Sequence, residues 1–247
     1  MRQIIDVLTE IAKMDEVCKR RSDPKFNDFH RYVSDMLYIL KAFKELSNYQ
    51  RTKIKILDAG SGAGVFSIAL ASLGFNVTAT DLSTEELSEI RFFKQFGCDF
   101  VPADFNNQKL PFSNEEFNVV LCLHVIEHLK KPLMVLNEFR RVLVPGGLLI
   151  LATPNGAITN YYKKLPSSLV IQGTEHVKEY TSIELAIMLT FSGFAVRNVG
   201  YSNEMVSASL SDITGLKRLL VQCYCLFCSL IPTSSYEIHM TAKAVNL

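Results

Sequence analysis

The feature of the sequence that most constrains the fold is a short β-rich run that ends in an acid and enters a glycine-rich turn. Residues 54–58 read IKILD, and residues 59–64 read AGSGAG. The apolar run VFSIALASLG at 65–74 follows, and it stops at a glycine as helices commonly do. A strand, a tight glycine turn and a helix in this order predict the first half of a βαβ unit.

The same pattern of strand, turn and helix continues along the chain. Further strands are predicted at 76–81, 98–104, 117–123, 148–153, 194–200 and 237–245, and helices at 29–43, 83–96, 132–143 and 182–192. Strands that alternate with helices form parallel βαβ units with right-handed crossovers. Because the first five strands are mostly apolar, we expect helices to cover both faces of an α/β sheet.

Acidic residues stand at the ends of the first three predicted strands. Asp58, Asp81 and Asp104 each precede a loop, and the first of them adjoins the glycine turn. In open α/β sheets, ligands bind beyond the carboxyl ends of the strands. Asp is a common turn residue, so one such acid would indicate little. Three acids in successive units point to a ligand with several hydrogen-bond donors.

The glycine turn is compatible with two classes of ligand. Gly60 and Gly62 supply the first two glycines of the dinucleotide fingerprint G-x-G-x-x-G, and Asp81 lies 21 residues after Gly60, where that fingerprint has an acid. The third glycine comes one position early, at Gly64. Asp58, two residues before Gly60, has no evident use beside a pyrophosphate but suits a ligand with an ammonium group.

Several segments together resemble the class I S-adenosylmethionine-dependent methyltransferases. They are ILDAGSGAG at 56–64, the acids Asp81 and Asp104, FNVVLCLHVIEHL at 117–129 and LNEFRRVLVPGGLLILATPN at 136–155. The resemblance covers about residues 50–200, and the order and spacing of the segments agree with the family. The chain is most similar to the small-molecule group that includes the ubiquinone-biosynthesis O-methyltransferases, which carry an E-x-x-E-H motif.

With this resemblance, we expect a Rossmann-like α/β fold. Its sheet would have seven mostly parallel strands, the last one antiparallel, with helices on both faces and an N-terminal helical lid. We expect a single methyltransferase domain over residues 1–247. Within it we expect a helical cap at 1–49, a cofactor-binding core at 50–200, an apolar insertion at 201–235 and the last strand at 236–247.

The resemblance also implies a site for S-adenosylmethionine. The loop from Asp58 to Gly64 would pass under the methionine part of the cofactor, with its ammonium on backbone carbonyls and Asp58 supporting the loop electrostatically. Asp81 would accept both ribose hydroxyls. The residues that the resemblance assigns to the cofactor are Asp58, Gly60, Ser61, Gly62, Asp81, Leu82, Asp104, Phe105, Leu123 and His124.

The remaining members of this set would surround the adenine and the sulfonium. Leu82 would pack on the adenine, Asp104 would accept its amino group, and Phe105 would lie beside the ring. Leu123 and His124 end the predicted strand 117–123 and would lie next to the sulfonium.

Three histidines are candidates for catalysis, namely His124, His128 and His176. If the acceptor is a hydroxyl, a histidine can remove its proton at neutral pH. His128 could equally belong to a helix start, and His176 to a structural loop.

The segment HVIEH at 124–128 also matches the H-x-x-E-H zinc motif. That motif needs both histidines on one helix face, and here the segment leaves a predicted strand. The methyltransferase subgroup has Glu where this chain has His124, which weakens any transfer of that subgroup's divalent-metal site. No metal is expected.

Charge and hydropathy limit the partners and the compartment. The 26 basic and 25 acidic side chains give a net charge of +1, so no nucleic-acid partner is expected. The N-terminal segment has acids at Asp6 and Glu10 and lacks the apolar region of a signal sequence, while the apolar run 219–231 is too short to span a bilayer. We therefore expect a cytoplasmic protein, whose six cysteines are buried thiols.

The expected function is transfer of a methyl group to a hydroxyl, carboxylate or amine of a small-molecule, glycan-linked or lipid-linked acceptor. The run 219–231 could hold a lipid-like acceptor, contact a membrane peripherally, pair with a second subunit or pack on the sheet as a cap helix. The chain is expected to be a monomer or a homodimer. The alternatives are a nucleic-acid or protein methyltransferase, a non-catalytic S-adenosylmethionine-binding protein and a nicotinamide enzyme.

Overall fold

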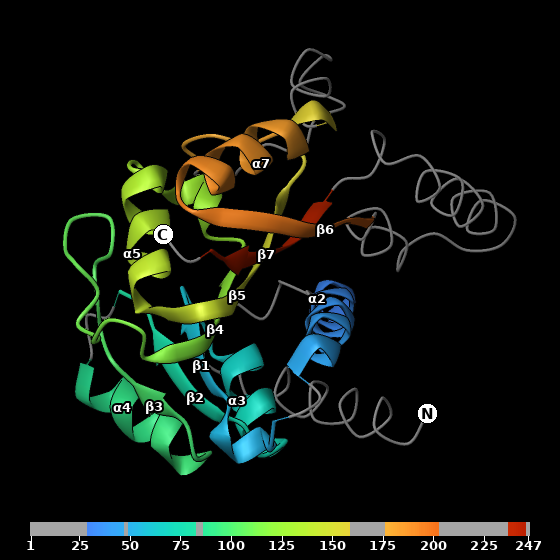
Figure 1. The fold of residues 1–247 in the computed structure, drawn as a ribbon. Coiled ribbons are helices and arrows are strands. Elements are labelled where there is room, and N and C mark those ends of the chain that lie inside the picture. The colour runs from blue at the N-terminus through green and yellow to red at the C-terminus, as the bar shows by residue number, and fades with distance from the viewer. Residues whose placement is uncertain (1–28, 47–48, 83–85, 159–175, 203–236, 246–247) are drawn as a thin grey trace, which may run out of the picture.

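The computed structural model describes residues 29–46, 49–82, 86–158, 176–202 and 237–245 (Figure 1). Several predictions lie outside these residues: most of the helical cap at 1–49, the first three residues of the helix predicted at 83–96, and most of the insertion at 201–235 with its apolar run 219–231. Among the described residues, no helix combines the length and the apolar character that crossing a membrane requires.

Seven strands form one sheet in the order β3-β2-β1-β4-β5-β7-β6. They are β1 (Lys55–Ala59), β2 (Asn76–Thr80), β3 (Asp99–Phe100), β4 (Phe117–Leu123), β5 (Leu143–Pro154), β6 (Phe194–Ser202) and β7 (Glu237–Ala244). Neighbouring strands pair in parallel, except that β7 pairs antiparallel with both β5 and β6. The predicted seven-stranded, mostly parallel sheet with an antiparallel last strand is therefore confirmed.

Helices cover both faces of this sheet, as predicted (Figure 1). The first face carries α2 (Phe29–Ala42), α3 (Val65–Ser72) and α4 (Glu86–Gln95), and the second carries α5 (Pro132–Val142) and α7 (Ser182–Phe191). Short 3-10 turns complete the described elements at η1 (Phe43–Leu46), η2 (Arg51–Lys53) and η3 (Ile126–His128).

The two cores follow from the alternation of side chains along each strand. In β4, Val119 and Leu121 belong to the first core, while Val120 and Cys122 belong to the second. Successive residues of a strand point to opposite faces, so a strand buried on both sides must be apolar throughout. All four of these side chains are fully buried, which explains the uninterrupted apolar run in the sequence.

Local sequence signals set the ends of several helices. Thr181 caps α7 by accepting a hydrogen bond from the Glu184 amide, and the Glu184 carboxylate accepts one from the Thr181 amide in return. This reciprocal capping box satisfies two amides that the first helical turn leaves unpaired. Pro132 opens α5, where its missing N–H costs nothing. Both starts are predicted correctly from the sequence.

Two strands differ from their predicted bounds by more than two residues. The strand predicted at 98–104 has regular strand geometry only at the two residues of β3, which lie opposite Thr78 and Ala79 of β2. The amides of Val101 and Ala103 still donate to the carbonyls of Ala79 and Asp81. β5 begins at Leu143 and so includes the PGG segment that was predicted to separate helix from strand. The ladder between β4 and β5 shifts its register there, and a Cβ on Gly147 would lie 2.9 Å from the Val144 carbonyl oxygen. The glycines thus permit an irregular strand in place of a break.

Helix α2 is part of the first core, although a lid was expected at the N-terminus. Its residues Met36 and Ile39 are fully buried. The helix contacts α3, β5 and β7, so it covers the sheet near the antiparallel strand (Figure 1). The described part of the N-terminal region therefore contributes directly to the stability of the domain.

We expect Ile39→Ala to lower the free energy of unfolding by about 2–5 kcal/mol, because it leaves a cavity between α2 and the sheet. The matched control is Leu37→Ala on the same helix, whose side chain is 42% exposed and whose loss should cost about 1 kcal/mol or less. Urea unfolding curves measure both. Equal losses of unfolding free energy in the two variants would show that α2 is not part of the cooperative core.

Candidate functional site

The parallel strands bring the predicted site residues to one edge of the sheet. β1 pairs with both β2 and β4, and Asp58 lies opposite Ala79 on one side and Leu121 on the other. The loops that follow these three strands therefore leave from the same edge. α3 after β1 covers one face and α5 after β4 covers the other, so a topological switch point lies between β1 and β4.

The glycine loop after β1 is held by the end of β2. The amides of Gly60 and Ser61 both donate to the Thr80 carbonyl, at 2.8 and 3.1 Å. The Gly64 amide then donates to the Ser61 carbonyl at 2.9 Å, and α3 begins. Gly60, Gly62 and Gly64 all have positive φ, at 81°, 51° and 91°. Glycine adopts this conformation without the penalty that a side chain would impose.

Two of these glycines also fill places where a side chain would not fit. A Cβ on Gly60 would lie 2.3 Å from a methyl carbon of Val125, and one on Gly64 would lie 2.5 Å from the Phe93 ring. A Cβ on Gly62 would meet nothing within 4 Å, so this glycine faces open space. The loop therefore packs against the segment after β4 at one end and against α4 at the other, with Gly62 outermost.

Asp81 stands directly after β2 and binds the glycine loop. Its carboxylate accepts hydrogen bonds from the amides of Gly62, at 2.6 Å, and of Leu82, at 2.7 Å. A carboxylate has about four lone-pair sites, so two amide bonds fix its orientation without exhausting its capacity. Leu82 is 67% exposed beside it. The pair offers a fixed anion next to an exposed apolar side chain.

Asp58 lies beneath the loop, in the interior. Its side chain accepts a hydrogen bond from the Ser67 hydroxyl at 2.5 Å. Burial raises the pKa of Asp58 to about 6, and the nearby charge of Asp81 acts in the same direction, while the bond from Ser67 opposes both. A cation bound above the loop would favour the ionised form, which fits the predicted electrostatic role.

The loop after β3 carries the two remaining adenine-side predictions. The Asp104 carboxylate accepts from the Asn106 amide at 3.2 Å and from the Asn107 side chain at 2.7 Å. The Phe105 side chain is buried in the second core, with its ring centroid 6.3 Å from that of Phe139. The structure thus places Asp104 at the site edge and Phe105 mainly in the core, and their contacts with an adenine stay predictions.

His124 follows Leu123 at the end of β4 in a left-handed conformation, with φ of 55°. Its amide donates to the Ala152 carbonyl at 2.8 Å, which anchors the turn to β5. Its imidazole Nε2 lies 3.2 Å from a carboxylate oxygen of Asp35, and its Nδ1 lies 3.8 Å from one of Glu127. His124 and His128 thus belong to different local structures, so they do not form the helical zinc motif.

His128 and His176 meet each other, although 48 residues separate them in the sequence. Their ring centroids lie 4.9 Å apart with the planes at 73°. His176 Nδ1 lies 2.6 Å from a Glu179 carboxylate oxygen. Donor atoms of Glu127, His128 and His176 also lie within 4.8 Å of one another, a grouping that can hold a metal ion. No metal was expected there from the sequence.

The structure therefore sorts the three candidate histidines into two groups, one with Asp35 and one with Glu179. Sequence reasoning missed both carboxylates. A signal for Asp35 was present, because it is an acid within the apolar stripe formed by Tyr32, Met36 and Ile39. Glu179 stands three residues after His176, a spacing that carries no distinctive signal in a loop.

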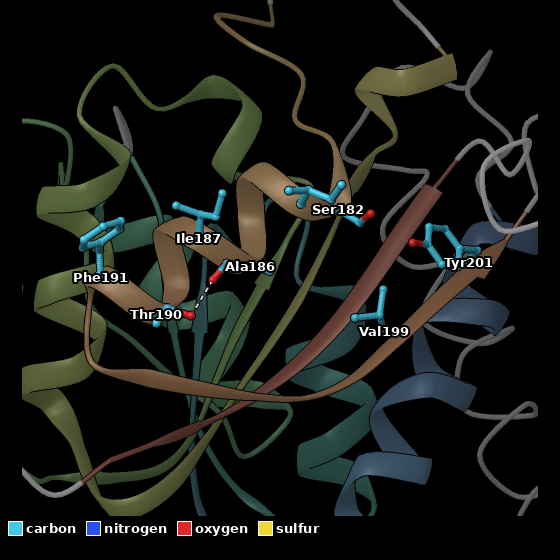
Figure 2. Close-up of a pocket in the computed structure, with 8 residues that line it drawn as sticks. Ser182, Ala186, Ile187, Thr190, Phe191, Val199 and Tyr201 are labelled. Atoms are coloured by element: carbon cyan, nitrogen blue, oxygen red, sulfur yellow. Dashed lines mark hydrogen bonds between the residues drawn. The ribbon is translucent and has the colours of Figure 1, made fainter.

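A separate hollow of about 460 Å³ lies between α7 and β6 (Figure 2). Ile183, Ile187 and Phe191 line it from the helix, and Val199 and Tyr201 line it from the strand. Four strand spacings separate β6 from β1, or roughly 19 Å at about 4.8 Å each. This apolar hollow is therefore distinct from the site at the glycine loop.

Comparison with known families agrees with this geometry. The pattern of a family described as a methyltransferase domain matches residues 29–199, which is more than half of the chain. The chain belongs to the class I S-adenosylmethionine-dependent methyltransferases. The cofactor of that family is S-adenosylmethionine.

Individual relatives support the assignment. A ubiquinone biosynthesis O-methyltransferase of Actinobacillus pleuropneumoniae is 33% identical over 129 residues, which are 50% of this chain and 53% of that protein. One from Histophilus somni is 28% identical over 177 residues, 68% of this chain and 70% of that protein. The chain thus spans about half the length of the Actinobacillus relative that it matches.

A solved S-adenosylmethionine-dependent methyltransferase of Methanosarcina mazei has the same fold. The two superpose with a TM-score of 0.55 at 20% identity, over 82% of this chain and 98% of that one. At this identity, the likeness concerns the fold alone.

The residues of the glycine loop fit this cofactor. The Ser61 hydroxyl oxygen is buried and has no hydrogen-bond partner among the described residues, so a polar ligand atom would satisfy it. Gly62 opens toward solvent, Asp81 offers carboxylate oxygens of fixed orientation, and Leu82 offers an exposed apolar surface. Hydroxyl donors of a ligand match the Asp81 carboxylate, and a flat apolar ring matches the exposed Leu82 side chain.

We expect Gly60→Ala to reduce the affinity for S-adenosylmethionine by at least about tenfold, because its Cβ would displace Val125 and the loop with it. Gly74→Ala is the matched control, since Gly74 also has positive φ, at 89°, but a Cβ there meets nothing within 4 Å. Isothermal titration calorimetry measures both. Equal losses of affinity in the two variants would show that backbone strain at a positive φ causes the effect, and not the displacement of the glycine loop.

We expect the affinity for S-adenosylmethionine to fall about tenfold between pH 7.5 and pH 5. Asp58 has a pKa of about 6, so it is ionised at the higher pH and mostly protonated at the lower, and a cationic ligand favours the ionised form. Asp58→Asn should bind more weakly at pH 7.5 and lose most of the dependence. Titrations at both pH values test this. A fall in affinity between pH 7.5 and pH 5 that is as large in Asp58→Asn as in the unsubstituted protein would contradict it.

Proposed function

We propose that the chain transfers the methyl group of S-adenosylmethionine to a hydroxyl oxygen of a small-molecule acceptor. The observation that carries this proposal is the pairing of each candidate histidine group with a carboxylate, at the edge of the sheet where the glycine loop lies. A histidine oriented by a carboxylate is a typical general base. The relatives from Actinobacillus pleuropneumoniae and Histophilus somni are O-methyltransferases, which agrees with an oxygen acceptor.

S-adenosylmethionine carries the methyl group on a positively charged sulfonium. When the methyl group is transferred, the sulfur leaves as a neutral thioether, so the leaving group needs no acid. The protein must therefore bind the cofactor, align the acceptor oxygen behind the methyl group and exclude water. Such alignment can contribute about 7–11 kcal/mol at best. In this proposal the glycine loop, Asp81 and Leu82 bind the cofactor, and the segment after β4 provides the acceptor side.

His124 is the proposed base. It follows β4 directly and precedes Val125, whose side chain occupies the space beside Gly60 of the glycine loop. The family resemblance also assigns this position to the neighbourhood of the sulfonium. A base must lie within hydrogen-bond reach of the acceptor proton, and that acceptor must lie in line with the methyl group.

His128 and His176 are proposed to contact the acceptor from the other side. His128 is exposed, and the Glu179 carboxylate at 2.6 Å orients the His176 ring against it. The Glu127 carboxylate is buried and accepts from the Thr153 hydroxyl at 2.9 Å, which ties this cluster to the end of β5. The arrangement suits a polar acceptor group such as a hydroxyl.

The finer expectations stay predictions. They include glycan-linked or lipid-linked acceptors, acceptor carboxylates or amines, a cytoplasmic location and a monomeric or homodimeric state. Nucleic-acid or protein methylation and cofactor binding without catalysis are the other outcomes that an acceptor screen distinguishes.

We expect S-adenosylmethionine and S-adenosylhomocysteine to bind the purified chain, and Asp81→Asn to bind both about 10- to 100-fold more weakly. The variant weakens the charge-assisted hydrogen bonds that the Asp81 carboxylate accepts, each of about 1.5–3 kcal/mol. Asp99→Asn, an exposed acid on the neighbouring strand, is the control for the change of charge. Calorimetry measures the affinities, with NAD as a competing candidate. Binding of NAD alone would overturn the proposed function.

A screen of phenols, alcohols, carboxylates and amines for release of S-adenosylhomocysteine then tests the acceptor class. Turnover of hydroxyl acceptors at saturating cofactor should fall about 10²- to 10⁴-fold in His124→Asn. Turnover of amines or carboxylates alone would contradict the hydroxyl assignment. Cofactor binding without turnover of any acceptor class would support the non-catalytic alternative.

A further inference from the structure

Helix α2 carries a buried acid that lies outside the set of residues assigned to cofactor or acceptor. The Asp35 side chain is fully buried, yet it belongs to an otherwise apolar helix face. One of its carboxylate oxygens lies 2.7 Å from His239 Nε2, and the other lies 3.2 Å from His124 Nε2. A single carboxylate thus joins the end of β4 to β7 through two imidazoles.

The carboxylate stays ionised in this setting. Burial alone would raise the pKa of Asp35, but the charges and hydrogen bonds of His124 and His239 outweigh it and hold that pKa well below its usual range. An ionised carboxylate only accepts hydrogen bonds, so both Nε2 atoms must be donors. The neutral form of His124 therefore carries its proton on Nε2, with the lone pair on Nδ1.

The partner histidine is itself held rigidly. The ring of Tyr38 stacks on His239 with centroids 4.9 Å apart and planes at 30°. The Tyr38 hydroxyl accepts from the Thr241 hydroxyl at 3.2 Å and donates to the Asn198 carbonyl at 3.4 Å. Asp35 is therefore fixed from α2 and from β7, so it can impose an orientation on His124.

The surroundings of His124 also suit a proton acceptor. Its left-handed backbone, with φ of 55°, is uncommon for a residue with a side chain and is typical of functional sites. Its Nδ1 lies 3.8 Å from a carboxylate oxygen of Glu127, which is buried. A proton taken up at Nδ1 would be stabilised by that negative charge.

We propose that Asp35 is a positioning residue for methyl transfer, which acts by holding His124 in the Nε2–H tautomer with Nδ1 as the proton acceptor. This inference rests on the proposed function of His124 as the base. The arrangement follows the general logic of a base that a carboxylate orients. It also gives helix α2 a part in catalysis through His124, beyond its contribution to the core.

The first test is the tautomer of His124 in the unsubstituted protein, measured by long-range ¹H–¹⁵N correlation spectra after labelling of its five histidines. His124→Asn and His239→Asn assign the signals. We expect both residues in the Nε2–H form when neutral, and Asp35→Asn should shift both signals, whereas Asp99→Asn should shift neither. An Nδ1–H signal for His124 would overturn the proposal even if Asp35→Asn fails to fold.

The second test is kinetic. Asp35→Asn should lower kcat about 10²- to 10⁴-fold while the KM and Kd for S-adenosylmethionine change less than about twofold. The double variant Asp35→Asn with His124→Asn should be no slower than His124→Asn alone, because both changes remove one function. Additive losses, or a loss of cofactor affinity that matches the loss of kcat, would show a merely structural role.

The third test is metal analysis of the purified protein. Donor atoms of Asp35, Glu237 and His239 lie within 4.8 Å of one another, so these residues could also hold a metal ion. A stoichiometric metal ion that Asp35→Asn removes would overturn the proposal and make Asp35 a ligand. If the unsubstituted protein fails to bind S-adenosylmethionine, the proposed function is wrong, whereas the tautomer measurement separately decides the role of Asp35.

Discussion

The turn from β1 into α3 is the constraint on which the rest of the site depends. Two successive amides, of Gly60 and Ser61, donate to a single carbonyl at the end of β2, so the loop must reverse within a few residues. Positive φ at three glycines makes this reversal feasible, and Val125 closes over the first of them. The same contact brings the end of β4, with His124, against the loop. Fold and site are thus connected through one tight turn.

Buried carboxylates set the electrostatic character of this region. Asp58 and Asp35 both lie in the interior, but their surroundings move their pKa values in opposite directions. Asp58 has a hydroxyl and another acid nearby, so burial dominates and its pKa rises. Asp35 has two imidazoles, so attraction dominates and its pKa falls. One acid is therefore poised to respond to a bound cation, and the other is a permanent anion that orients its neighbours.

The sequence predicted elements well wherever local signals and burial agreed. β4 has its predicted bounds because every residue from Phe117 to Leu123 faces one of two cores, apart from the partly buried Asn118. β3 was predicted too long, because after Phe100 the chain keeps single hydrogen bonds to Ala79 and Asp81 but leaves the regular strand geometry. The PGG segment was predicted as a break, although glycine can also permit a bulge when a neighbouring strand continues beside it.

The sequence by itself determined the βαβ repeat, the glycine loop and the acids at the strand ends, because these depend on residues close together in the chain. It also supplied the three histidines. Only the tertiary structure decided how those histidines are grouped, since Asp35 reaches His124 across 89 residues and His239 across 204. Such partners are chosen by helix and strand packing, which no local spacing encodes. Nothing in the sequence pairs an acid on an N-terminal helix with a strand at the other end of the chain.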